Sequence, residues 1–290
     1  MSSAAVDVVI PSYNGGHLLQ KHLLKVIKNT PNLQKLIIVD DGGTDDTAGI
    51  VAKLAPQAIV VRNSTNLGFT KSVNLGVQLV TAPYFVLLNN DVEPQPHYLT
   101  SPLELITNPK VAAVTFSEDK HSWPMVTFKE GKISFQEGLD RTQNRVIAWP
   151  SGGSCLIKLS VWQQLSGFNP IYSPGYWEDI DLGWRINKLG LQIIWDSTSK
   201  VIHQHESTFK NLNQHKMNLH KSRNELLFNW LNINSSFFKI THIAWLVKYC
   251  LLHPGYLRVV FCAIQAISSN RYLYKKGLDS MVFNKVNLPA

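Results

Sequence analysis

The stretch Val-Asp-Val-Val-Ile-Pro-Ser-Tyr-Asn-Gly-Gly, residues 6–16, decides the fold class. Its first five residues are mostly β-branched, which predicts a short strand that ends at Pro11. Leucine, valine and isoleucine then recur at helical spacing, with Asn14 in position to cap the helix. An apolar run at residues 36–39 predicts the next strand. The chain therefore begins as strand, helix, strand, which favours a parallel sheet with a right-handed crossover.

The same alternation continues as far as residue 116. Thr44 is expected to cap a second helix, whose first turn carries Asp45 and Asp46 at the end that favours negative charge. Residues 84–88 are all apolar, so this strand is expected at the centre of the sheet. Further elements are predicted as strands at 59–61 and 111–116 and a helix at 69–80. The pattern predicts an α/β fold with a Rossmann-like, mostly parallel sheet flanked by helices.

The remainder of the chain is less regular. A hairpin is predicted at Met125–Phe128 and Lys132–Phe135, and two more strands at 191–195 and 200–203. From about residue 212 the chain changes to long helical patterns. We therefore expect one domain over residues 1–210 and a C-terminal helical extension over residues 211–290.

The bulk composition is ordinary for a globular protein, with 44% hydrophobic and 17% charged residues. The net charge of +8 suits an anionic ligand, a nucleic acid or an acidic membrane surface. No basic run with interleaved aromatic residues supports nucleic-acid binding, so none is expected. The N-terminus has no secretory signal, and no apolar run is long enough to predict a transmembrane helix. Cys155, Cys250 and Cys262 are far apart, which favours reduced thiols in a cytoplasmic protein.

Acidic residues gather in three places. Trp-Glu-Asp-Ile-Asp-Leu-Gly-Trp-Arg, residues 177–185, combines three carboxylates with apolar neighbours that can raise their basicity. The alternative is the charged face of a helix with Trp184 in the core. Asp40-Asp41 and Asn89-Asn90-Asp91 each follow a predicted strand, so they should meet on one rim of the sheet. Converging carboxylates there require a cation or a ligand that donates hydrogen bonds.

Six motifs in order resemble the family-two glycosyltransferases, the inverting nucleotide-sugar enzymes of GT-A fold. They cover roughly residues 6–206 and comprise Ile10–Asn14, Val39–Thr47, Asn66–Gly76, Leu87–Asp91, Trp177–Arg185 and Val201–His203. The resemblance implies a nucleotide-binding half at about 1–116 and an acceptor and catalytic half at about 117–210. It also implies sugar transfer from a nucleotide-diphosphate donor to a saccharide or lipid-linked acceptor. Relatives often have arginine where this chain has Val73, so the base contact made by that arginine must come from elsewhere. The lack of a Gln-x-x-Arg-Trp motif and of membrane spans argues against a processive synthase. Asn89-Asn90-Asp91 and Glu178–Leu182 resemble rhamnosyltransferase-type relatives.

The same resemblance implies roles for individual residues. Asp40 or Asp41 would accept the imide N–H of a uracil or thymine base, which makes a UDP- or dTDP-linked donor the expected one. The alternative for this pair is turn chemistry before Gly42-Gly43. The other residues implied to line the donor site are Pro11, Tyr13, Asn14, Gly68, Asn89, Asn90 and Gly153.

The implied metal ligands are Asp91 and His203, with His205 as a substitute. They would hold Mg²⁺ or Mn²⁺ against the diphosphate, although Asn89 replaces the first Asp of the family's Asp-x-Asp signature. An imidazole ligand would favour Mn²⁺. The alternative for His203 is an ordinary hydrogen-bonded side chain at a strand end.

Asp179 matches the family's catalytic base. Glu178 is the second candidate, or a group that positions the acceptor, and Trp177 would contact the acceptor. Arg185 could tether Asp181, four residues earlier on a helix.

Other functions fit less well. A nucleotidyltransferase needs a basic glycine-rich loop after the first strand, and a dinucleotide dehydrogenase needs G-x-G-x-x-G there; the sequence has neither. A degenerate carbohydrate-binding module of the same fold would be expected to have lost Asp91 or Asp179, and both are present. The apolar segment 239–267 leaves two hypotheses open. Its helices either pack on the catalytic domain or dock peripherally on an anionic inner leaflet of the membrane.

Overall fold

The computed structural model describes residues 4–119, 123–129, 131–138, 141–204, 214–232 and 235–269. The chain divides into two units. The first joins Met1–Lys129 to Ile133–Met217, and the second joins Glu130–Lys132 to Asn218–Ala290. Within the described residues, no helix has the length and apolarity needed to cross a membrane.

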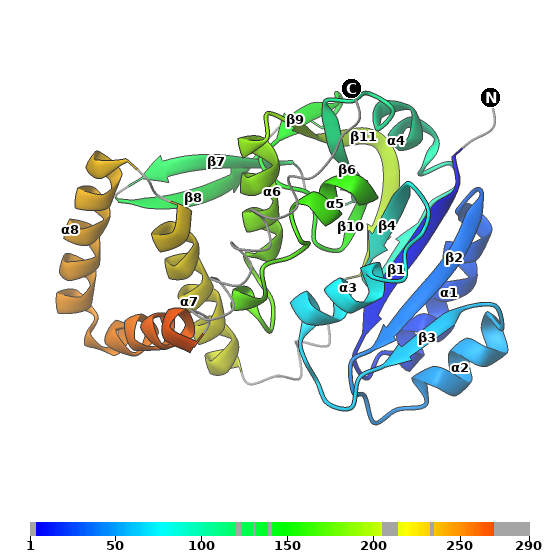
Figure 1. Cartoon of the computed structure of the whole chain (residues 1–290), viewed down its shortest axis with the longest axis horizontal. Helices are drawn as coiled ribbons and strands as arrows, with labels where there is room; N and C mark the ends of the chain where they lie inside the picture. Colours follow the sequence, from blue (N-terminus) through cyan, green and yellow to red (C-terminus); the bar gives the residue numbers. More distant parts are fainter. Residues whose placement is uncertain are drawn as a thin grey trace, which may run out of the picture. The chain divides into compact units, whose positions relative to one another are not determined.

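The first unit is built on a large twisted sheet (Figure 1). Its strands follow the order β3-β2-β1-β4-β10-β6-β11-β5, and β9 pairs with β11. Strands β1 to β4, β6 and β11 run in one direction, whereas β5, β9 and β10 run against them. Strand β4 lies between β1 and β10, at the centre as predicted. The bounds are β1 Val6–Ser12, β2 Leu33–Asp40, β3 Ile59–Arg62, β4 Tyr84–Leu88, β5 Val92–Pro94, β6 Val111–Glu118, β9 Arg145–Ile147, β10 Ser154–Lys158 and β11 Gln192–His203.

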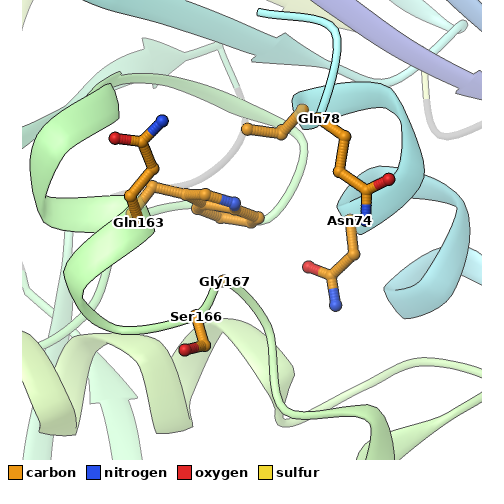
Figure 2. Close-up of a pocket in the computed structure, with 7 residues that line it drawn as sticks. Asn74, Gln78, Gln163, Ser166 and Gly167 are labelled. Carbon is orange, nitrogen blue, oxygen red and sulfur yellow. The ribbon is translucent and has the colours of Figure 1, made fainter. Parts of the chain in front are cut away.

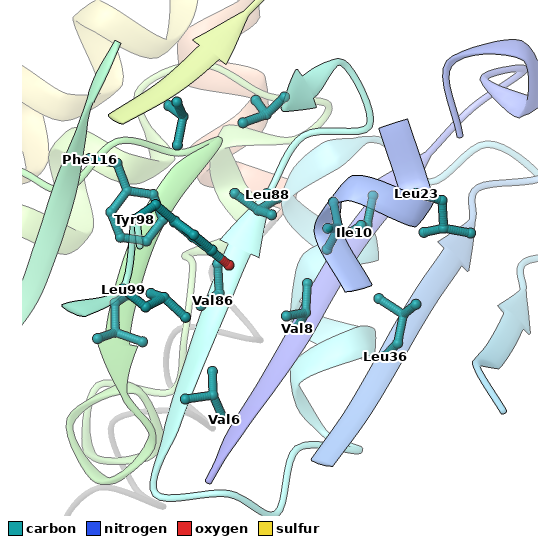
Figure 3. Packing of buried hydrophobic residues seen from close by; sticks show 14 of the residues in the cluster. Val6, Val8, Ile10, Leu23, Leu36, Val86, Leu88, Tyr98, Leu99 and Phe116 are labelled. Carbon is teal, nitrogen blue, oxygen red and sulfur yellow. The ribbon is translucent and has the colours of Figure 1, made fainter. Parts of the chain in front are cut away.

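Helices cover both faces of this sheet. Alternate residues of β1 point to opposite faces, so Val6, Val8 and Ile10 enter one buried cluster and Val9 enters the other. Figure 3 shows the first cluster, in which Val8 and Ile10 lie near Leu36 and Val86 of the flanking strands. The helices are α1 Gly16–Asn29, α2 Thr47–Leu54, α3 Phe69–Val77, α4 Thr100–Leu105, α5 Leu159–Gln164 and α6 Glu178–Lys188, with a 3₁₀ turn η1 at Pro170–Tyr172.

Some local predictions were wrong. Asn14 does not cap α1, because Gly15 occupies the N-cap and Asn14 instead accepts a hydrogen bond from the Thr44 amide at 2.7 Å. The cap of α2 is Asp46, whose carboxylate accepts from the Gly49 amide, rather than Thr44. The two strands expected near the end of the sheet are one strand, β11. Its pairing with β6 is interrupted between Asp196 and Lys200, which explains the break in the sequence pattern.

The predicted hairpin forms as β7 (Pro124–Lys129) and β8 (Lys132–Glu137). The second unit holds most of α7 (Gln214–Asn232), together with α8 (Ser236–Leu252), the 3₁₀ turn η3 (Pro254–Tyr256) and a helix over residues 257–269. Within it, the His242 ring donates from Nδ1 to the Gly131 carbonyl at 2.6 Å. Lys132 pairs with Glu225 at 3.1 Å. The helices expected from residue 212 are present, and the break expected at Pro254-Gly255 is the turn η3.

The contact of α3 with the sheet generates a stability prediction. A methyl group on Gly76 would come within 2.7 Å of Val9 Cγ1 and 2.8 Å of Val39 Cγ2. Gly76→Ala should therefore overpack this contact and lower the free energy of unfolding by about 1–3 kcal/mol. Urea unfolding measures it, with Lys71→Ala on the exposed face of α3 as the control. An unchanged midpoint for Gly76→Ala would show that the helix can move away without cost.

Candidate active site

The ends of β1, β2 and β4 meet at one rim. Ser12 pairs with Asp40 across β1 and β2, and the side-chain Nδ2 of Asn90 donates to Ser12 Oγ at 2.9 Å. Gly15 lies so close to Asn90 that a side chain there would come within 2.0 Å of Asn90 Nδ2. Asn90 and Asp91 are buried. The rim expected from the strand ends is therefore formed, and close packing of polar side chains holds it together.

Asp40 and Asp41 differ in how their oxygens are used. Asp41 accepts hydrogen bonds from Asn63 Nδ2 and from the Leu67 and Gly68 amides, all at 2.8 Å. Its role is to fix the loop before α3. Asp40 Oδ1 accepts from the Gly43 amide at 2.9 Å. Among the described residues, Asp40 Oδ2 has no hydrogen-bond donor and lies 3.5 Å from Arg62 Nε. Of the two carboxylates, only Asp40 keeps an oxygen without a hydrogen bond.

The loop after β1 lies next to this pair. Pro11 is the buried penultimate residue of β1, and Tyr13 and Asn14 are partly buried after it. Asn14 has a positive φ of 49° and accepts from Thr44 across the loop that follows β2. Asn14 thus lies beside the loop that Asp40 begins, and Pro11 pairs with Val39, the residue before Asp40.

Gly68 connects the rim to the segment before α6. Its φ is +86°, and a side chain there would come within 2.5 Å of Pro174 Cα. Ser173 Oγ donates to the Leu67 carbonyl at 3.0 Å. Because the Asp41 carboxylate fixes Leu67 and Gly68, it also supports the chain that leads into α6.

A turn of two glycines makes the second connection. The Asn89 amide donates to the Gly153 carbonyl at 2.8 Å, and a side chain on Gly153 would come within 2.3 Å of Asn89 Nδ2. A side chain on Gly152 would lie 3.3 Å from Asp179 Oδ2. This turn, which we call the glycine turn, therefore touches the rim through Asn89 and the start of α6 through Asp179.

Helix α6 begins with a dense acidic turn. Tyr176 and Trp177 precede it with left-handed φ angles of 73° and 75°, an unfavourable conformation for aromatic residues that is common at functional sites. Trp177 is buried at the N-cap. Asp181 accepts from Tyr172 Oη at 3.1 Å and from Arg185 Nε at 2.7 Å, so the predicted tether is confirmed. Asp181 is thereby committed to structure, which leaves Glu178 and Asp179 as the candidates for chemistry.

Burial separates these two carboxyl groups. Glu178 is buried, and among the described residues its Oε2 has no hydrogen-bond partner. Burial, together with the charge of Asp179, raises the pKa of Glu178 well above its usual range. Burial also raises the pKa of Asp179. The pKa rises only to about 6 because backbone amides, including those of Ile180 and Gly152, donate hydrogen bonds to the carboxylate and offset part of the effect of burial. Near neutral pH Asp179 is therefore ionised, whereas burial favours the neutral form of Glu178.

His203 lies at the end of β11 between two carboxylates. Its Nε2 is 3.1 Å from Asp91 Oδ1, and its Nδ1 is 3.1 Å from Glu118 Oε2. Burial lowers the pKa of His203, but the two acidic partners outweigh it and raise the pKa to about 9. The sequence reasoning missed Glu118, which pairs with Val201 across β6 and β11; its position at the end of β6 was the available signal. His205 is outside the described residues.

The pair Asp91 and His203 fits part of a divalent-ion site. Two neighbouring ligands of an octahedral Mg²⁺ or Mn²⁺ lie roughly 3 Å apart, close to the 3.1 Å between Asp91 Oδ1 and His203 Nε2. Glu118 on the other ring nitrogen resembles the carboxylates that orient metal-binding imidazoles. Within the described part of the chain, no group of three His, Cys, Asp or Glu side chains is arranged to hold an ion. The remaining ligands would have to come from elsewhere.

A separate cavity of about 420 Å³ lies between α3 and the end of α5 (Figure 2). Its polar lining includes Asn74, Gln78, Gln163 and Ser166. Asn74 also exchanges two hydrogen bonds with the backbone of Phe168, at 2.8 and 2.9 Å. None of the predicted site residues lines this cavity, so it is distinct from the rim.

Comparison with known proteins places this geometry in a family. The sequence model of glycosyl transferase family 2 matches residues 7–165, more than half of the chain. The chain is 24% identical over 255 residues to the N-acetylglucosaminyl-diphospho-decaprenol L-rhamnosyltransferase of Mycobacterium tuberculosis, covering 75% of this chain and 82% of the relative. The predicted resemblance to rhamnosyltransferase-type relatives is therefore confirmed.

Solved structures support the fold. GalNAc-T7, in a structure with UDP, GalNAc and Mn²⁺, superposes with a TM-score of 0.62 at 14% identity over 78% of this chain and 47% of its own. The mannosyltransferase PcManGT of Pyrobaculum calidifontis, in complex with GDP-Man and Mn²⁺, gives a TM-score of 0.60 at 16% identity, covering 98% of this chain and 82% of its own. The GT-A fold expected from the sequence is thus confirmed. With the family model matched over most of the first unit, this chain is a glycosyltransferase and belongs to glycosyltransferase family 2.

Proposed function

We propose that this enzyme transfers a sugar from a nucleotide-diphosphate donor to a saccharide or lipid-linked acceptor, with inversion at the anomeric carbon. The observation that carries the proposal is Asp179. It is a partly buried carboxylate with a pKa near 6, and the glycine turn joins it to the rim. A base in this position would face an acceptor while the rim holds the donor.

The rim would bind the nucleotide. Pro11, Tyr13 and Asn14 would line the base and ribose, and Asp40 would accept the imide N–H of uracil or thymine. Asp40 Oδ2, which has no hydrogen-bond donor among the described residues, supports this choice over Asp41, whose carboxylate is occupied by the loop. A UDP- or dTDP-linked sugar is therefore the proposed donor. The diphosphate would lie near the remaining residues of the donor set, which are Gly68, Asn89, Asn90 and Gly153.

Asp91 and the neutral ring of His203, which must first lose the proton that its two carboxylate partners favour, would hold Mg²⁺ or Mn²⁺ beside the diphosphate. When bound, such an ion neutralises and polarises the leaving phosphate. The imidazole ligand favours Mn²⁺. Glu118 would keep the His203 ring oriented, and donor phosphate oxygens would complete the ligand set. The structures of GalNAc-T7 and PcManGT with Mn²⁺ are consistent with this proposal.

Asp179 would act as the general base. The acceptor hydroxyl oxygen attacks the anomeric carbon from the face opposite the diphosphate, and the bond from that carbon to the phosphate oxygen breaks. Because attack and departure take place on opposite faces, the configuration inverts. The hydroxyl proton passes to Asp179, and the nucleotide diphosphate leaves. Glu178, whose neutral form burial favours, would position the acceptor, and Trp177 would contact it.

For the acceptor, the comparison with a relative supports a lipid-linked molecule. The Mycobacterium tuberculosis relative is named for a diphospho-decaprenol acceptor, which favours a lipid-linked acceptor here. A cytoplasmic location suits a nucleotide-sugar donor and the three free cysteines, Cys155, Cys250 and Cys262. A panel of nucleotide sugars, with nucleotide diphosphate release as the readout, tests the function. If none of the donors in the panel releases nucleotide diphosphate, the protein would instead be a carbohydrate-binding module.

The base assignment predicts that Asp179→Asn lowers kcat by about 10²–10⁴ because no carboxylate then takes the proton. Nucleotide diphosphate affinity should stay within a few-fold, since Asp179 is at α6 and not in the donor set. Transfer assays and titration calorimetry measure the two quantities. Glu178→Gln is the matched control and should retain most of the rate. The reverse pattern, with Glu178→Gln inactive and Asp179→Asn active, would swap the two roles.

The metal assignment predicts that Asp91→Ala weakens nucleotide diphosphate binding in Mn²⁺ by at least about tenfold but has little effect in EDTA. Calorimetry under both conditions measures the difference. Asp46→Ala, which removes the α2 cap away from the diphosphate site, serves as a control for general destabilisation. Equal affinity of the wild-type protein in Mn²⁺ and in EDTA would rule out an ion that bridges Asp91 and the phosphates.

A further inference from the structure

The second unit exposes an unusual amount of apolar surface. Of the fifteen large hydrophobic side chains that are exposed among the described residues, ten lie between residues 237 and 264. They are Phe237, Phe238, Ile240, Ile243, Val247, Leu251, Leu252, Leu257, Phe261 and Ile264. Isolated exposed hydrophobics are normal, whereas a concentration of this kind marks an interaction surface.

On α8 the exposed residues form one stripe. Ile240, Ile243, Val247 and Leu251 are spaced by three or four residues, so they share one face of the helix. The opposite face is packed within the unit. There His242 is buried, and Trp245 and Tyr249 stack with ring centroids 5.2 Å apart. The stripe is therefore not part of the core of this unit.

The charges beside the stripe are all of one sign. Residues 235–269 contain no Asp or Glu, and their only charged residues are Lys239, Lys248 and Arg258. At about 100° per residue, Lys239 and Lys248 project roughly 80–100° to either side of Ile240. Both are exposed. The helix thus presents an apolar face bordered on each side by a lysine. On the next helix, the exposed Leu257 and Phe261 have one basic neighbour, Arg258.

We propose that this surface, formed by α8 and residues 257–269, docks on an anionic lipid bilayer. The apolar stripe would enter the headgroup and acyl boundary, while the basic residues would contact the lipid phosphates. A second copy of the chain fits less well. A twofold contact through this surface would bring lysines together with no carboxylate from residues 235–269 to pair them. An anionic membrane supplies the missing negative charge.

Docking deepens the proposed function, because it would concentrate the enzyme where a lipid-linked acceptor lies. Binding to the bilayer itself needs neither donor nor acceptor. A sedimentation assay with plain lipid vesicles therefore tests the surface separately from glycosyl transfer.

The full chain is mixed with vesicles of phosphatidylcholine alone or with about 30% phosphatidylglycerol, and bound protein is measured after sedimentation. Binding should require the anionic lipid and should weaken as salt rises from about 0.1 to 0.5 M. The variant Ile240→Ser/Val247→Ser/Leu251→Ser should lower the partition coefficient by at least about tenfold. The matched control Leu24→Ser/Leu189→Ser changes exposed leucines of the first unit and should bind like the wild-type protein.

The basic residues are tested independently. Lys239→Gln/Lys248→Gln should lose more than about tenfold in affinity at low salt, whereas Lys28→Gln/Lys53→Gln should not. This arm remains informative if the serine variant does not fold. Indifference of the wild-type protein to anionic lipid would overturn the proposal. A second outcome would also overturn it. If the wild-type protein does not bind vesicles but is a dimer in analytical ultracentrifugation, and the serine variant is a monomer, the surface is an interface between copies.

Discussion

The site depends on one close contact, the packing of the glycine turn between the rim and α6. Gly153 holds the Asn89 amide and leaves no room for a side chain beside Asn89 Nδ2. The Gly152 backbone hydrogen-bonds the Asp179 carboxylate, and a side chain there would come within 3.3 Å of Asp179 Oδ2. Strand β10 begins directly after the turn and pairs with β4, so the central strands fix the position of the turn. The distance between the proposed donor site and the proposed base is thus set by a turn in which Gly153 leaves no room for a side chain.

The same contact explains why adjacent carboxyl groups differ. Glu178 and Asp179 both lie in the first turn of α6, where the helix dipole favours negative charge. Asp179 gains backbone hydrogen bonds, including one from Gly152, which limit the rise of its pKa to about 6. Glu178 is buried with an unpartnered oxygen, so desolvation raises its pKa further. Asp179 is therefore able to accept a proton, whereas burial favours the neutral form of Glu178.

Much of this arrangement follows from the sequence, because local patterns determine it. The apolar runs placed β1, β2 and β4, and their parallel alternation placed Asp40 and Asp91 on one rim. Patterns could not reveal contacts between distant segments. The choice between Asp40 and Asp41 depends on the Leu67 and Gly68 amides, and the partner of His203 is Glu118, more than eighty residues away. Helix caps were misplaced for the same reason, since Asn14 bonds across the loop to Thr44 instead of to its own helix.

The central claim is that Asp179, held at the glycine turn with a raised pKa, is the base. The pH dependence of kcat/KM for transfer to a neutral acceptor tests it most directly. The active form is ionised, so kcat/KM should be constant above about pH 7 and fall as the pH drops through about 6, the pKa of Asp179. At about pH 5 the loss should be roughly tenfold. A flat profile from about pH 7 to pH 5 would contradict the account, because a group with this pKa would not control the reaction.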